Sequence, residues 1–111
     1  MEITTQHFKR CDLLSITGKV DSFTAPDLTK AIDAINNEGR FKIVLDLSKM
    51  EYMSSAGFRA LLLGQRTCKR FNRGEIVLAG VPKKIMDALE LTGFTPLFKI
   101  FDEVTPAVGF F

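Results

Sequence analysis

One stretch of the chain decides the fold: residues 43–62, which read IVLDLSKMEYMSSAGFRALL. Together with Phe41 and Lys42, its first five residues form a segment that is apolar almost throughout and rich in branched side chains. This segment predicts a buried strand ending at Leu47. A loop is expected over Ser48–Ser55, and a helix is predicted to begin at the serine pair Ser54 and Ser55. Backbone N–H groups in a first helical turn lack partners within the helix, and the helix dipole adds positive character there. A serine hydroxyl at this point therefore lies where a phosphoryl group would be tolerated.

Composition narrows the class of protein. The chain has 111 residues, 46% of them hydrophobic, and a formal net charge of only +2. That is enough apolar material for one core, so we expect one domain over residues 1–111, and no overall field favours nucleic acid or an anionic membrane as partner. Cys11 and Cys68 belong to no metal or redox motif, which is typical of free thiols in the cytoplasm. Neither a signal peptide nor an apolar run of membrane-spanning length is evident, so no membrane insertion is expected.

Hydrophobic periodicity predicts the remaining elements. Alternation over Leu14–Val20 indicates a strand, and residues 3–8 form a more polar strand that pairs with it as a hairpin. Thr24 and Asp27 have the spacing of a capping box, which predicts a helix that stops at Gly39. Further along we expect a helix over 55–72 with a basic exposed side, a strand over 75–80, a helix from Pro82 to near Gly93, and a last strand over 98–102. This order predicts an α/β fold with a mixed, largely parallel sheet of about five strands and three to four helices.

Two loops are candidates for a functional site. In open α/β sheets, functional groups gather beyond the carboxyl ends of parallel strands. The loop that follows Val20 contains Asp21 and Ser22, and the loop that follows the central strand leads to Ser55. If these two strands are neighbours, Asp21 and Ser55 lie on one rim of the sheet.

The motifs on these loops resemble those of a known family. The residues that carry the resemblance are Ile43 to Ser48, Tyr52 to Gly57, Gly18 to Asp21, Thr24 to Pro26, and Leu91 to Phe94. In this arrangement the chain resembles, over nearly its whole length, the STAS domain of bacterial anti-sigma factor antagonists. The resemblance implies a partner-switching regulator that is itself not an enzyme. Such an antagonist binds an anti-sigma factor, which is also a serine kinase, and is released when the kinase phosphorylates its motif serine.

Carried over by position, the resemblance implies specific roles. The phospho-acceptor falls on Ser55, and the acidic residue of the first loop falls on Asp21. Many family members have Asp just before the acceptor, whereas this chain has Ser54, so the acceptor stays open between Ser54 and Ser55. The implied partner-binding surface comprises Asp21, Ser22, Ser54, Ser55, Gly57 and Arg59. A serine phosphatase is a further possible partner.

The residues themselves argue against most catalytic classes. The single histidine, His7, has no recognisable nucleophile or orienting carboxylate and is expected to be exposed. No set of Asp, Glu, His and Cys has metal-ligand spacing, and no Gly-rich phosphate loop occurs, so no metal or cofactor is expected. From local pattern alone, a serine at a helix start is more often an N-cap than a modification site.

Other surfaces leave alternatives open. The basic face from Arg59 to Arg73 fits a solvated surface better than a nucleic-acid site. The apolar tail from Pro106 to Phe111 either docks on the domain or seeks a partner, so a weak homodimer is a minor hypothesis. The main alternative function is an unphosphorylated STAS scaffold or a transporter-associated subunit, for example in lipid transport, and a small-molecule sensor ranks last.

Overall fold

A computed structural model describes residues 1–70, 74–93 and 95–111. Five strands form one sheet in the order β1-β2-β3-β4-β5: β1 (Glu2–His7), β2 (Asp12–Val20), β3 (Lys42–Met53), β4 (Glu75–Ala79) and β5 (Ile100–Phe101). Strand β1 is antiparallel to β2, and the other three pairs are parallel. The predicted mixed, largely parallel α/β sheet is therefore confirmed.

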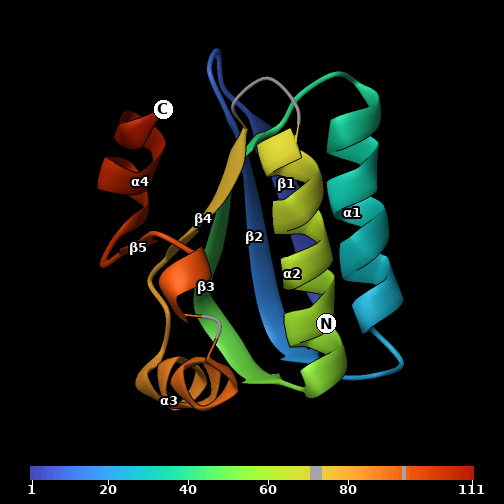
Figure 1. Ribbon diagram of the computed structural model, residues 1–111, viewed down its shortest axis with the longest axis vertical. Helices are drawn as coiled ribbons and strands as arrows, with labels where there is room; N and C mark the ends of the chain where they lie inside the picture. Colours follow the sequence, from blue (N-terminus) through green and yellow to red (C-terminus); the bar gives the residue numbers. More distant parts are fainter. Residues whose placement is uncertain (71–73, 94) are drawn as a thin grey trace.

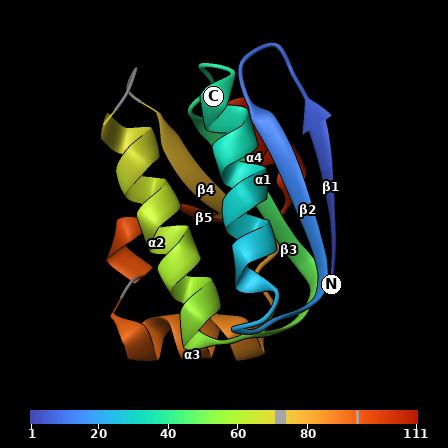
Figure 2. The same cartoon turned by 90° about the vertical axis from the view of Figure 1, so that its right-hand side faces the viewer.

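Helices cover both faces of this sheet unequally. Helices α1 (Ala25–Asn37) and α2 (Ser55–Arg70) lie side by side on one face, as Figure 2 shows. Helix α3 (Lys83–Thr92) crosses the end of the sheet where β2 and β3 finish (Figure 1). The short helix α4 (Val104–Phe110) packs on the opposite face against β3, β4 and β5, and a 3-10 turn, η1 (Thr95–Leu97), precedes β5.

Alternation along the strands divides the interior into two apolar clusters. Leu14, Leu45 and Leu78 point toward α1 and α2 and belong to the larger cluster, together with the buried faces of those helices. The neighbouring residues Leu13, Val44 and Val77 point the other way, into a smaller cluster closed by Ala107 of α4. Since successive side chains of a strand face opposite sides, a strand buried on both faces has the continuous apolar run seen in the sequence.

The structure corrects several predicted boundaries. Strand β3 does not end at Leu47 but continues to Met53, so most of the expected loop is strand. Ser48, Lys49, Glu51 and Tyr52 are exposed along this extension, whereas Met50 and Met53 are buried, and pairing with β2 maintains the strand through two register shifts. The last strand has two residues in place of five. Residues 71, 72 and 73, which belonged to the predicted α2 helix and its basic face, lie outside the described residues, as does Phe94.

The apolar tail proves to be helix α4. Val104, Ala107 and Val108 contact the smaller cluster, and Phe111 packs there as well. Of the two outcomes expected for this tail, docking on the domain is therefore the one observed. None of the helices in the described part of the chain is both long and apolar enough to cross a membrane.

Candidate functional site

The carboxyl ends of β2 and β3 meet at one edge of the sheet. Val20 pairs with Met53 at the last position of the ladder, and the Ser54 N–H donates to the Val20 carbonyl at 2.8 Å. Asp21 therefore follows Val20 immediately beside the start of α2. The expectation that the Asp21 loop and the serine pair share one rim is confirmed as geometry, and we call residues 21–24 and 54–55 the switch rim.

Asp21 organises its own loop through a set of hydrogen bonds. Its Oδ1 accepts the backbone N–H groups of Phe23 and Thr24, each at 2.9 Å, and the Thr24 hydroxyl accepts the N–H of Asp21 at 2.9 Å. These bonds, first that from the Thr24 N–H, lower the pKa of the exposed Asp21 carboxyl, so it is ionised at neutral pH. The predicted capping box is wrong: Thr24 is the residue before α1 but makes no side-chain cap bond, because its hydroxyl is engaged with Asp21.

The two serines have different environments. Ser54 precedes α2, and its Oγ accepts the N–H of Gly57 at 3.4 Å, which is a long N-cap bond. Ser55 is the first residue of the helix and is exposed. Within the described residues, neither its hydroxyl nor the N–H groups of Ser55 and Ala56 have a hydrogen-bond partner. An exposed hydroxyl therefore lies beside two free backbone donors at the positive end of a helix.

Gly57 lies beneath the switch rim and is buried. A Cβ on Gly57 would come within 2.6 Å of Met53 Cγ and 3.0 Å of Val20 Cγ1. The absence of a side chain thus lets the first turn of α2 pack closely on the ends of both strands. This close packing sets the position of Ser55 relative to Asp21.

One prominent residue of the switch rim, Phe23, has no signal in the sequence that marks it as functional. The Phe23 side chain is 88% exposed, although its backbone N–H is bound by Asp21. Ser22 is exposed beside it, and Arg59 is exposed one turn into α2. Isolated exposed apolar residues are common, so exposure alone does not make Phe23 a candidate binding residue. Its position on an ordered loop at the rim does.

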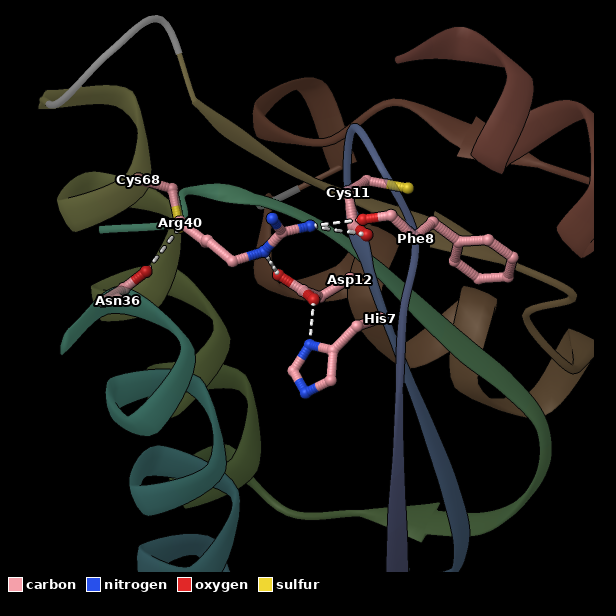
Figure 3. Close-up of polar contacts among 7 residues, drawn as sticks. All are labelled: His7, Phe8, Cys11, Asp12, Asn36, Arg40 and Cys68. Carbon is pink, nitrogen blue, oxygen red and sulfur yellow. Dashed lines mark hydrogen bonds and ion pairs between the residues drawn. The ribbon is translucent and has the colours of Figure 1, made fainter. Parts of the chain in front are cut away.

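A second polar cluster occupies the opposite end of the sheet (Figure 3). The buried carboxylate of Asp12 lies 2.5 Å from His7 Nδ1 and accepts a hydrogen bond of 2.6 Å from Arg40 Nε. Arg40 Nη2 also donates to the carbonyls of Phe8 and Cys11. The expectation that His7 has no carboxylate partner is therefore wrong, although its side chain is 58% exposed as predicted. No local pattern signals this cluster, because Arg40 and Asp12 are 28 residues apart.

Both cysteine thiols, those of Cys11 and Cys68, are free and buried. Burial raises the pKa of the Cys11 thiol, and it raises that of Cys68 to about 12, so both thiols are protonated at neutral pH. Figure 3 shows that the Cys11 contact with Arg40 is made by its carbonyl and not by its sulfur. Among the described residues, no three His, Cys, Asp or Glu side chains are grouped to hold a metal ion.

Comparison with known proteins establishes the family. The model of the STAS domain family matches residues 2–107, and the chain belongs to this family. BtrV of Bordetella bronchiseptica, which has anti-sigma factor antagonist in its name, is 28% identical over 111 residues, covering 100% of this chain and 95% of its own. The anti-sigma-B factor antagonist of Listeria monocytogenes is 26% identical over 85 residues, covering 77% of this chain and 74% of its own.

Solved structures share the fold at lower identity. The crystal structure of tm1081 from Thermotoga maritima has a TM-score of 0.89 at 21% identity and covers 96% of this chain and 92% of its own. Phosphorylated SpoIIAA from Bacillus has a TM-score of 0.73 at 14% identity, with 98% and 96% covered. A sulfate transporter family protein from Wolinella succinogenes has a TM-score of 0.79 at 22% identity, with 92% and 84% covered. The fold therefore serves more than one functional class, and function has to be argued from the site.

Proposed function

We propose that this protein is a cytoplasmic anti-sigma factor antagonist that binds its anti-sigma factor through the switch rim and is released when Ser55 is phosphorylated. The observation that carries the proposal is the Ser55 hydroxyl, which is exposed and unpartnered within the described residues and lies beside the ordered Asp21 loop. The names of the Bordetella and Listeria relatives support the antagonist role. The solved phosphorylated form of SpoIIAA supports phosphorylation as the control.

The acceptor assignment rests on the difference between the two serines. Ser54 uses its hydroxyl oxygen as a cap for the Gly57 N–H, whereas Ser55 has no such bond. A kinase needs the acceptor hydroxyl free to attack a phosphoryl group in line, which favours Ser55. The aspartate that many family members have before the acceptor is Ser54 here, so residues 21–24 and 54–55 of the switch rim contain one carboxylate, that of Asp21.

The switch acts on binding and leaves the fold unchanged. A phosphoryl group adds about −1.5 to −2 charges at neutral pH together with three acceptor oxygens. The free Ser55 and Ala56 N–H groups and the helix dipole stabilise that charge in the free protein. In an interface the same charge must be desolvated beside the Asp21 carboxylate, and an unpaired buried charge costs about 2–5 kcal/mol of affinity. A serine phosphatase would restore binding by removing it.

The direct test uses the anti-sigma factor purified from the same organism. We expect Ser55→Glu to weaken binding at least about 30-fold in calorimetry, while its melting temperature stays within about 2 °C of the unmodified protein. Ser55→Ala, which cannot be phosphorylated, should bind like the unmodified protein and should resist release by Mg-ATP. Equal affinity of the Ser55→Glu variant and the unmodified protein would reject the switch.

Phosphopeptide mass spectrometry then separates the remaining alternatives. After incubation with the anti-sigma factor and Mg-ATP, phosphate should appear on Ser55 and not on Ser54. Phosphate on Ser54 would move the acceptor by one residue. If an active kinase modifies neither serine and binds neither variant, the scaffold or transporter-associated alternative replaces the antagonist.

A further inference from the structure

The solvent-facing side of α2 holds a cationic stripe that the switch rim does not use. Arg59, Leu63, Arg66 and Arg70 recur at intervals of three and four residues, so they lie along one side of the helix, with Lys69 next to them. All four cations are exposed, and none forms an ion pair within the described residues. We call these five residues the α2 stripe.

The charge of the stripe is concentrated on one element. Helix α2 contains four cations and no acidic residue, whereas the whole chain has a formal net charge of only +2. The helix dipole stabilises the positive charges of Lys69 and Arg70 in the last turn. It destabilises the charge of Arg59 near the first turn and does not stabilise that of Arg66 in the interior of the helix. Arg66 also has like charges three and four residues ahead, which destabilises an isolated helix. No acidic residue of α2 itself lies at the same spacing to balance these charges.

An apolar residue lies at the centre of the charges. The Leu63 side chain is 50% exposed, between Arg59 and Arg66 along the stripe. A groove of about 670 Å³ lies beside it, lined by Leu63, Arg66, Thr67, Lys69 and Arg70. Leu63 also borders the crevice between α1 and α2, where Gly64 permits close approach of the two helices. Figure 2 shows that the adjacent helix α1 leaves the outer side of α2 open.

We propose that the α2 stripe docks an acidic amphipathic helix of a partner protein, with an apolar side chain of that helix covering Leu63 and its carboxylates pairing with Arg66 and Arg70. Arginine binds carboxylates through two parallel hydrogen bonds, and an apolar centre within a charged rim is the usual organisation of a protein interface. A nucleic acid would gain nothing from Leu63, and the described part of α2 offers no exposed aromatic ring for base stacking.

The residues that the proposed helix contacts, Leu63, Arg66 and Arg70, are separate from the switch rim, whereas Arg59 is four residues from Ser55. Leu63 is eight residues from Ser55, or about 12 Å along the helix, and Arg70 is about 22 Å away. A partner helix on the stripe can therefore be bound whether or not Ser55 is modified. The proposal does not rest on the antagonist function, and it can fail or succeed independently of it.

The test uses the intact protein and a defined probe. The probe is a synthetic helical peptide of about 18 residues with leucines on one face and glutamates flanking them, and binding is followed by fluorescence anisotropy and by amide NMR shifts. We expect the shifts to concentrate on residues 59–70. Arg66→Glu combined with Arg70→Glu should weaken binding at least about tenfold, and Leu63→Ser about fivefold.

The matched control reverses the charge of two exposed lysines on another helix, which changes the net charge by the same amount as the α2 variant. Lys83→Glu combined with Lys84→Glu on α3 should change affinity less than about twofold. The unmodified protein should bind a peptide whose leucines are replaced by glutamine more weakly than it binds the leucine peptide. The Leu63→Ser variant should bind the two peptides with equal affinity. The proposal is overturned if the peptide does not bind, if the α3 control loses as much affinity as the α2 variant, or if a single-stranded DNA of similar length binds more tightly than the peptide.

Discussion

Phe23 is the large apolar residue that the switch rim exposes to solvent, and its side chain is not part of the buried core. Its ring is almost fully exposed, and the hydrogen bond from its backbone N–H to Asp21 holds the backbone of the loop that carries it. A partner that covers this ring gains apolar burial, and the backbone that carries the ring is already ordered by Asp21. The same ring leaves the core of the free protein untouched.

At this scale we predict that Phe23→Ala weakens binding to the anti-sigma factor by about 10- to 30-fold, as for an aromatic residue near the centre of an interface. The melting temperature should not change, because the side chain has no buried contact. Phe23→Tyr keeps the ring and serves as the control, with affinity close to that of the unmodified protein. Titration calorimetry measures both variants, and an unchanged affinity for Phe23→Ala would place the ring outside the interface.

At the scale of elements, the packing of α2 on β2 and β3 positions Ser55. The first turn of the helix approaches the strand ends so closely that Gly57 has no room for a side chain. In contrast, a Cβ on Gly109 of α4 would meet nothing within 4 Å. The two glycines thus allow a matched comparison within one protein.

We predict that Gly57→Ala destabilises the protein by about 1–2 kcal/mol, since Met53 and Val20 must shift to admit the methyl group. Gly109→Ala should be neutral or stabilising by about 0.4–1 kcal/mol, because alanine reduces the entropy of the unfolded chain at no steric cost. Urea unfolding measures both free energies. Equal changes for the two variants would show that α2 is not packed against Met53 in the way described.

At the scale of the whole molecule, the Asp12 cluster joins parts of the chain that are distant in sequence. Arg40 follows α1, and its guanidinium reaches both the carboxylate of Asp12 in β2 and the carbonyl groups of the β1–β2 turn. Arg40 is one-third exposed whereas Asp12 is fully buried. Removing the cation therefore leaves a buried carboxylate with His7 as its remaining side-chain partner.

We predict that Arg40→Met lowers the free energy of unfolding by about 2–3 kcal/mol, at the low end for a buried pair because Arg40 is partly solvated. Arg10→Met, which removes an exposed arginine of the same turn, should cost less than about 0.5 kcal/mol. Adding Asp12→Asn to Arg40→Met should recover part of the loss, since no buried charge then remains unpaired. If the double variant is as unstable as the sum of the two single variants, the residues do not act as a pair.

The sequence by itself determined the α/β class, the five strands and the serine pair at the start of α2, because these depend on local periodicity and on the chemistry of a helix terminus. It also placed Asp21 and Ser55 on one rim, since parallel strands that are neighbours end at the same edge. Only the tertiary structure decided that β3 continues to Met53, that the tail forms α4, and that His7 and Arg40 meet at Asp12. Each of these depends on contacts that local sequence does not encode. Pairing with β2 maintains a polar strand, the smaller apolar cluster orders the tail, and the buried Asp12 carboxylate binds His7 on the adjacent strand and Arg40, which is 28 residues away.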